Sequence, residues 1–227
     1  MAGIKSLKGT RAWNLVEKEA PDVGELTKHA YMIPYKLNTV STSMAMLGTM
    51  CDYGVRSRFP NSYYHYITKS KTDAYNYLLW NGPITAVEAY YLSNIYLERY
   101  YWHDELSDDI IRDYTHIVER AYAMYATYGP GIAKYGAYFE YGDLAFECDI
   151  LNNFMVGDLK VTSKGYNNEH MYQIMSYSFL CNIIDGRLRN SLHLYYPVQG
   201  EVYFYTFNIE KYTSLVAEFE HYLKEGY

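Results

Sequence analysis

The chain has 227 residues, of which 49% are hydrophobic and 20% charged, a composition that supports a sizeable core and excludes a disordered polypeptide. Its formal net charge of -6 excludes a protein that coats nucleic acid through overall positive charge, so any DNA-binding surface must be local. The three cysteines are widely spaced and include no CxxC pair, which excludes a disulfide framework and a four-cysteine metal cluster.

The amino-terminal part of the chain is predicted to be mainly helical. Residues 1–40 have a mixed composition with two prolines, which indicates an arm with one short helix. Residues 41–136 carry helix formers with apolar side chains at three- and four-residue intervals, together with capping and stop signals. Helices are predicted there over residues 43–59, 84–101 and 110–128.

From residue 137 onward, strand patterns alternate with helix patterns. Strands are predicted over residues 137–141, 144–151, 154–162, 191–196 and 201–208, and helices over 168–184 and 209–224. Asparagines between the second and third strands predict a hairpin turn, because asparagine tolerates positive φ. We therefore expect a single domain over 1–227 with an α/β or α+β fold. A central mixed sheet of about five strands, within 137–227, would be flanked by helices.

Two acids and a lysine fall on the predicted hairpin. Asp158 and Lys160 are two residues apart on one strand and share a face, and Asp149 on the neighbouring strand can share that face. Converging carboxylates suit Mg²⁺ or Mn²⁺, and a lysine beside them can position an attacking water. The alternative is an ordinary Asp–Lys pair on a solvent-facing strand.

Asp149 followed by the segment 158–160 resembles the signature of the PD-(D/E)XK nuclease superfamily. Gln173 and Tyr177 lie four residues apart on the next predicted helix, and so on one helical face. This spacing resembles the additional QxxxY motif of the RecB-like and phage recombination exonucleases in that superfamily. The two motifs in succession are more specific than either alone, and the resemblance implies a restriction-endonuclease-like core.

The helix predicted over 43–59 carries a further likeness. Gly48 is followed four residues later by Asp52, and then by Arg56 and Phe59, an order similar to the first motif of the lambda-type phage exonucleases. The sequence departs from that motif because it has aspartate where glutamate is usual. Asp52 is therefore either a metal ligand, directly or through water, or a solvated helix residue.

The resemblance implies a role for each matching residue. Metal ligation is implied for Asp149, Asp158, Asp52 and the Leu159 carbonyl group. Lys160 is expected to orient the nucleophilic water during phosphodiester hydrolysis. Gln173 and Tyr177 are expected to brace the site or to contact a DNA phosphate.

Other residues are candidates from their position in the sequence. Glu140 and Asp143 lie just before the hairpin and are either additions to the carboxylate cluster or ordinary strand-end and turn residues. Glu147 precedes Asp149 by two residues and so shares its face, which makes it a possible substitute ligand. Candidate phosphate contacts, or simply solvated polar residues, are Arg56, Arg58, Thr162, Ser163 and Lys164. Candidate stacking rings, or core residues, are Tyr63, Tyr64, Tyr90 and Tyr91 among the chain's 30 tyrosines.

Signals of several other protein classes are absent from the sequence. The first residues lack the apolar segment of a secretory signal, and no run reaches the roughly 18 apolar residues of a membrane span. We therefore expect no membrane association and a reducing cytoplasmic compartment. The seven histidines lack the close spacing of a zinc site, and no GxxxxGK[ST] phosphate-binding loop is present.

The sequence thus predicts a Mg²⁺- or Mn²⁺-dependent deoxyribonuclease, and an exonuclease of a phage or viral recombination or DNA-processing system before a site-specific enzyme. Such a protein would act in the host cytoplasm. Its expected partners are DNA, a recombination or replication protein, and further copies of the chain. Two alternatives remain: a catalytically inactive module of the same fold that binds DNA or protein, and a helical interaction protein in which residues 144–161 form no hairpin.

Overall fold

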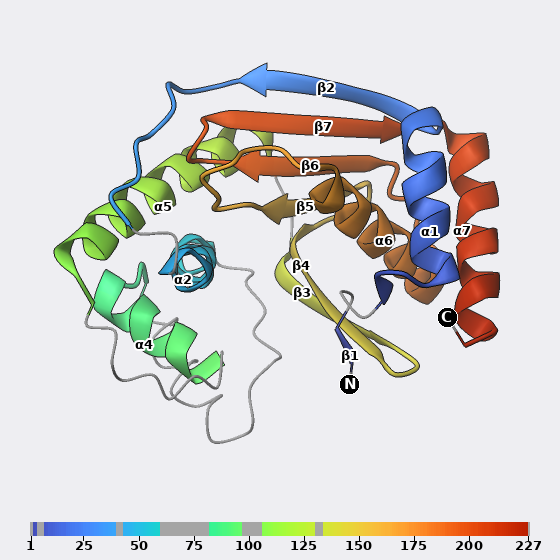
Figure 1. Ribbon diagram of the computed structural model, residues 1–227, viewed down its shortest axis with the longest axis horizontal. Helices are drawn as coiled ribbons and strands as arrows, with labels where there is room; N and C mark the ends of the chain where they lie inside the picture. The colour runs from blue at the N-terminus through green and yellow to red at the C-terminus, as the bar shows by residue number, and fades with distance from the viewer. Residues whose placement is uncertain are drawn as a thin grey trace.

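The computed structural model describes residues 2–3, 7–39, 43–59, 82–96, 106–129 and 134–226. Within these ranges the chain forms one mixed sheet with helices packed against both faces (Figure 1). The predicted α/β class with a central mixed sheet is therefore confirmed. Tyr63 and Tyr64 lie outside the described residues. No described helix combines the length and apolar character that crossing a membrane demands.

The sheet has seven strands among the described residues. They are β1 (Ala2–Gly3), β2 (Gly24–Ala30), β3 (Lys134–Tyr141), β4 (Leu144–Leu151), β5 (Met155–Leu159), β6 (Ser191–Tyr196) and β7 (Glu201–Phe207). Their order is β1-β4-β5-β6-β7-β2, and β3 pairs with β4 off this path. The β1–β4 and β5–β6 pairs are parallel and the remaining pairs are antiparallel.

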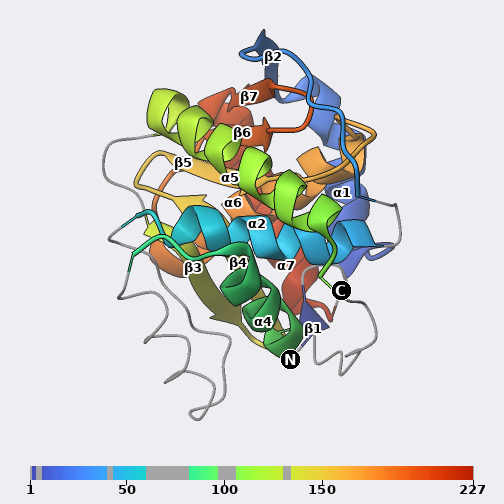
Figure 2. The same ribbon diagram turned by 90° about the vertical axis from the view of Figure 1, so that its left-hand side faces the viewer.

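Helices form a layer on each face of the sheet (Figure 2). One layer consists of α1 (Arg11–Glu19), α6 (Asn168–Asp185) and α7 (Ile209–Lys224), and the short 3-10 helix η2 (Ala20–Asp22) follows α1. The other consists of α2 (Met44–Arg56), α4 (Ala86–Tyr96) and α5 (Asp108–Tyr128). Each layer has its own cluster of buried apolar side chains against the strands. The two clusters hold the sheet between them and so fix the positions of the helices relative to its strands.

The elements predicted from residue 43 onward are present, with ends that differ by a few residues, but residues 97–101 of the helix predicted over 84–101 lie outside the described residues. Local signals explain where the helices begin and end. The side chains of Ser107, Asn167 and Asn208 accept hydrogen bonds from the first turns of α5, α6 and α7. Helix α6 ends at Gly186, which takes a φ of 70° that favours glycine.

The prediction for residues 1–40 was wrong in part. The short helix is present as α1, but Gly24–Ala30 forms the edge strand β2, paired antiparallel with β7 along its whole length. Six of the seven residues of β2 are exposed, and its sequence GELTKHA therefore lacks the alternation of a half-buried strand. This strand is formed by backbone hydrogen bonds to β7. Such bonds do not depend on side-chain type, so the sequence pattern does not reveal them.

The chain leaving β2 is attached to the turn between β6 and β7. The backbone N–H groups of Tyr31 and Met32 both donate to the carbonyl oxygen of Gly200, at 2.8 and 3.0 Å. Gly200 has a φ of 71°, and a Cβ atom at this position would collide with the Met32 carbonyl oxygen. Glycine is therefore required here both for its backbone conformation and for this close approach.

We expect Gly200→Ala to lower the free energy of unfolding by about 2–4 kcal/mol, because a backbone collision adds to the cost of positive φ. Gly142→Ala is the matched control, since Gly142 has a φ of 56° but nothing lies within 4 Å of the added Cβ. That control should lose only about 1 kcal/mol. Urea unfolding followed by circular dichroism measures both, and equal losses would contradict the importance of the Met32 contact.

Candidate metal centre

The candidate site lies beside β4, near the edge opposite β3. Strand β3 pairs along one edge of β4. On the opposite edge, among the described residues, β1 pairs only at Leu144–Ala145 and β5 only at Ile150–Leu151. Within the part of the chain that the structure describes, residues 146–149 therefore have no strand partner on this edge, and we call this stretch of the edge the gap. On the β3 side, Gly136 takes a φ of 69° and interrupts the ladder opposite Asp149.

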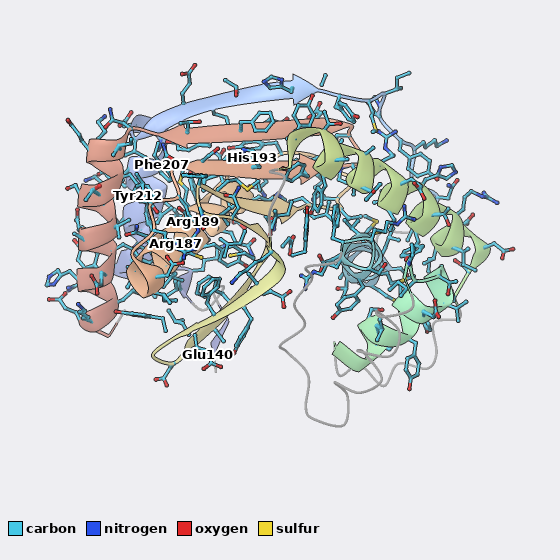
Figure 3. All side chains as sticks on the ribbon, turned by 180° about the vertical axis from the view of Figure 1, so that it is seen from behind. Glu140, Arg187, Arg189, His193, Phe207 and Tyr212 are labelled. Atoms are coloured by element: carbon cyan, nitrogen blue, oxygen red, sulfur yellow. The ribbon has the colours of Figure 1, made fainter. Side chains whose placement is uncertain are left out.

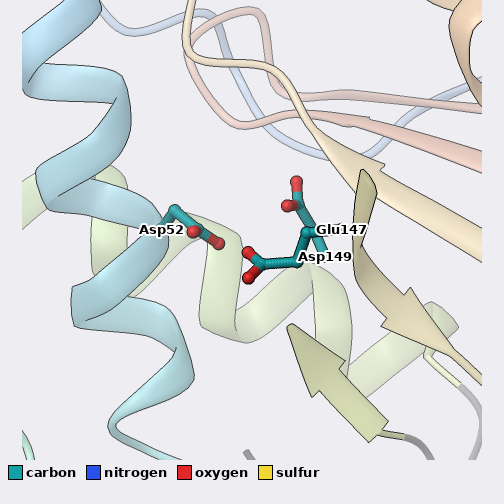
Figure 4. Close-up of side chains that lie close together, drawn as sticks. All are labelled: Asp52, Glu147 and Asp149. Carbon is teal, nitrogen blue, oxygen red and sulfur yellow. The ribbon is translucent and has the colours of Figure 1, made fainter. Parts of the chain in front are cut away.

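Three carboxylates meet at this gap. Asp52 reaches from α2 toward Glu147 and Asp149, which lie two residues apart on β4 (Figure 4). One oxygen of each residue lies within 4.8 Å of one oxygen of the other two. Their side chains are only 17–21% exposed. The trio is thus a compact set of hard oxygen donors, the kind that Mg²⁺ and Mn²⁺ prefer.

The packing of α2, which carries Asp52, depends on one of its glycines. A Cβ atom at Gly54 would collide with the ring of Tyr114 on α5, so only glycine lets the two helices approach this closely. At Gly48 a Cβ would lie 3.8 Å from the Cβ of Val161, in the segment that follows β5. Helix α2 therefore packs between α5 and the end of β5, and its acidic residue faces β4.

Arg56, one helical turn after Asp52, contacts all three carboxylates. Its Nη2 atom lies 2.6 Å from Asp52 Oδ2, 3.3 Å from Asp149 Oδ1, and in contact with Glu147 Oε1. The Arg56 side chain is 3% exposed. The guanidinium group is thus buried against acidic side chains in this structure, and a contact between Arg56 and a DNA phosphate stays a prediction.

A second polar group starts at the end of β5, beside the trio. The Nζ atom of Lys160 lies 2.5 Å from Asp158 Oδ2 and donates to Gln173 Oε1 at 3.0 Å. The side-chain amide of Gln173 donates to the Tyr177 hydroxyl at 2.7 Å, and the Tyr177 ring stacks on Phe146 of β4. Helix α6 thereby holds the lysine through a chain of polar contacts, as the bracing role predicted for Gln173 and Tyr177 requires.

Asp149 connects the two groups. The register of the hairpin brings Asp149 opposite Asp158, at the point where the pairing between β4 and β5 ends. There the Asp149 carboxylate accepts a hydrogen bond of 2.7 Å from the backbone N–H of Leu159. Asp158 is 5% exposed, and its Oδ2 atom receives no hydrogen bond of good geometry from any group in the described part of the chain, despite the nearby lysine.

The accumulated negative charge perturbs the acids. Burial and the neighbouring Asp158 together raise the pKa of Asp149 to about 6, against the lowering effect of Arg56. Burial also raises the pKa of Asp52 well above its ordinary value, against the lowering effect of Arg56. Counting Asp158, four carboxylates face two cations, Arg56 and Lys160, which leaves two formal negative charges uncompensated. A divalent cation carries the charge that would balance them.

The ligand set differs from the one that the sequence motifs implied. Glu147, considered only as a substitute ligand, belongs to the compact trio, whereas Asp158 lies beside it and pairs with Lys160. Glu140 accepts a hydrogen bond from Tyr138 near the far end of the β3–β4 hairpin (Figure 3), and Asp143 is exposed in its turn. Neither belongs to the trio.

The remaining candidates lie at the rim or away from it. Thr162 is partly exposed, and Ser163 and Lys164 are exposed in the loop after β5, so their role as phosphate contacts stays a prediction. Arg58 pairs with Glu119 at 2.8 Å, away from the trio. Among the tyrosines proposed for stacking, Tyr91 is exposed on α4 and Tyr90 is partly buried.

The sequence contained a signal for Glu147 but none for the placement of Arg56. Glu147 precedes Asp149 by two residues on one strand and therefore shares its face. Arg56 follows Asp52 by four residues, a spacing that permits an ion pair between them on the helix. The contacts of Arg56 with β4, 91 and 93 residues away in the chain, follow only from the packing of α2 against the sheet.

Comparisons with models of known protein families, with characterised proteins and with solved structures find no match to this chain. The likeness to the PD-(D/E)XK nucleases therefore depends on the motifs and on where the fold brings their residues.

The raised pKa of Asp149 predicts a pH-dependent stability. The unfolded chain loses this proton near pH 4 and the folded chain near pH 6, so the contribution to stability falls as the pH rises between these values. In metal-free buffer, the free energy of unfolding of Asp149→Asn relative to wild type should increase by on the order of 2 kcal/mol from pH 4 to pH 6.

Urea titrations at intervals of half a pH unit measure this difference. Asp185→Asn is the control, because its ion pair with Arg189 lowers the pKa of Asp185 and places its transition below pH 4. The control difference should be nearly flat between pH 4 and pH 6. If the difference in unfolding free energy between Asp149→Asn and wild type were also independent of pH, the raised pKa of Asp149 would be contradicted.

Proposed function

We propose that this chain is a Mg²⁺- or Mn²⁺-dependent nuclease that hydrolyses phosphodiester bonds in DNA. One observation carries the proposal: Asp149 belongs to the carboxylate trio and also accepts a hydrogen bond from the backbone N–H of Leu159, between Asp158 and Lys160. A set of hard oxygen donors beside a restrained ammonium group is what metal-assisted phosphodiester hydrolysis needs.

The residues of the site fit a divalent cation. Asp52, Glu147 and Asp149 offer three carboxylates within 4.8 Å of one another, and Asp158 adds a buried oxygen beside them. When all four carboxylates are ionised, Arg56 and Lys160 leave two negative charges unbalanced, and Mg²⁺ or Mn²⁺ would supply the missing positive charge. A cation bound there would stabilise the negative charge that develops on a phosphate during hydrolysis.

The protein groups around the site would orient the reactants. Lys160 is held from two sides, by Asp158 and by Gln173, so its ammonium group has little freedom to turn away. An ammonium group held in this way can orient a water and stabilise developing charge. Tyr177 is 6% exposed and restrains Gln173, so its contribution would be to hold Lys160 and not to contact substrate.

That the substrate is DNA and that the enzyme is an exonuclease is proposed from the sequence motifs and not from the geometry of the site. This part of the proposal depends on the likeness of Gln173 and Tyr177, and of the segment 48–59, to motifs of the RecB-like and lambda-type phage exonucleases. A recombination or DNA-processing role, with a partner protein and further copies of the chain, is proposed on the same likeness.

One observation favours the rival function of a catalytically inactive binding module. Arg56 already contacts each member of the carboxylate trio and neutralises part of its charge. A buried arginine among acids can be a purely structural ion network. Titration of the protein with a divalent metal separates this alternative from the nuclease, because a purely structural ion network would bind no divalent cation.

Isothermal titration with Mn²⁺ should detect one site in the wild-type protein, and Asp149→Asn and Glu147→Gln should each weaken binding by about tenfold to a hundredfold, since each removes a charged ligand. Glu140→Gln is the matched control, because Glu140 is exposed on β3 outside the trio. It should leave the affinity unchanged. An absence of Mn²⁺ binding to wild type would refute the proposed metal site.

Lys160→Ala should slow digestion of linear duplex DNA by about 100-fold or more while changing Mn²⁺ affinity by less than about threefold, because Lys160 acts on the reactants and ligates no metal. Lys18→Ala, on the exposed surface of α1, is the control and should cleave as wild type does. Full activity of Lys160→Ala would show that Lys160 has been assigned the wrong role.

A further inference from the structure

Arg56 occupies the position that a cation shared by the three carboxylates would take. Its Nη2 atom lies within ion-pair distance of one oxygen from each of Asp52, Glu147 and Asp149. Its Nε atom also donates to Asp52 Oδ1 at 2.8 Å. No other described cation contacts more than one member of the trio.

The fit between this arginine and its three partners is incomplete. An Nη2 atom carries two hydrogens but faces three carboxylates, so it cannot give each of them a strong hydrogen bond. The longest of the three contacts, 3.3 Å, is the one to Asp149. A divalent cation has no such limit, because it coordinates several oxygens at 2.0–2.6 Å in one shell.

Two cations cannot use these oxygens at once. A metal at coordination distance from all three would overlap the space of Nη2, and at 3% exposure solvent does little to screen the repulsion between them. A guanidinium group keeps its charge at every physiological pH, so the conflict is relieved only if the side chain moves.

We propose that Arg56 is a built-in counter-cation that competes with the divalent metal for the oxygens of Asp52, Glu147 and Asp149. The inference rests on the proposed metal site. Without metal, Arg56 keeps the buried acids together. When the metal binds, the Arg56 side chain moves away from the carboxylate oxygens that coordinate the metal. Arg56 therefore sets the metal concentration at which the site fills.

The test is Mn²⁺ affinity by isothermal titration, with wild type, Arg56→Gln and Arg58→Gln side by side. We expect Arg56→Gln to bind Mn²⁺ at least about tenfold more tightly than wild type, because the competing charge is gone. Arg58→Gln removes the same charge two residues away, where Arg58 pairs with Glu119, and should leave the affinity within about twofold of wild type.

Thermal unfolding gives a second readout that needs no activity. Without metal, Arg56→Gln should melt roughly 5–10 °C below wild type, since three buried carboxylates lose their shared partner. Saturating Mn²⁺ should restore most of this loss. Arg56→Lys is the variant for use if Arg56→Gln does not fold, because it keeps the charge on a shorter, single ammonium group; its Mn²⁺ affinity should lie between those of wild type and Arg56→Gln.

The outcomes separate the two proposals. If wild type binds Mn²⁺ and removal of Arg56 leaves the affinity equal or weaker, Arg56 orients the ligands and the competition is refuted while the metal site stands. If wild type binds none but Arg56→Gln binds, the competition is supported and the wild-type nuclease is not. If neither the wild type nor either Arg56 variant binds Mn²⁺, both proposals fail.

Discussion

The burial of several negative charges at one point of the sheet is the constraint on which the rest of the site depends. Carboxylates that lose water without a partner are costly, and they respond by holding protons or by recruiting cations. Both responses occur here. Burial raises the pKa values of Asp52 and Asp149, while Arg56 and Lys160 lie against the acids. Arg56 comes from α2, which packs on one face of the sheet, and Lys160 directly follows β5.

The end of the β4–β5 ladder is where the Asp149 carboxylate is held. Among the described residues, β4 and β5 pair only at Ile150–Leu151, so the backbone N–H group of Leu159 has no β4 carbonyl group opposite it. The Asp149 carboxylate accepts a hydrogen bond from this N–H group instead. A side chain thus takes up a backbone group at the point where the ladder stops, as buried polar groups require.

The two helical layers contribute different chemistry from opposite faces of the sheet. Helix α2 supplies an acid and its counter-cation, Asp52 and Arg56, whereas α6 supplies Gln173 and Tyr177, which restrain the lysine. A metal-dependent nuclease and an inert ion network would share this arrangement. In an inert ion network Arg56 would stay on the three carboxylates, whereas in a nuclease a divalent metal would replace it there. The position of Arg56 therefore bears both on the proposed activity and on the metal concentration that the activity requires.

The sequence by itself determined most elements and the identity of the polar residues. Helical spacing predicts α2, α5, α6 and α7, and the strands from β3 to β7 follow from apolar patterns and turn signals, because these depend on neighbours in the chain. Tertiary structure alone decided the edge strand β2, whose exposed residues show no period. It also decided the ligand grouping. Whether Glu147 or Asp158 joins Asp52, and where Arg56 lies, depends on packing between segments about 90 residues apart, which local patterns do not encode.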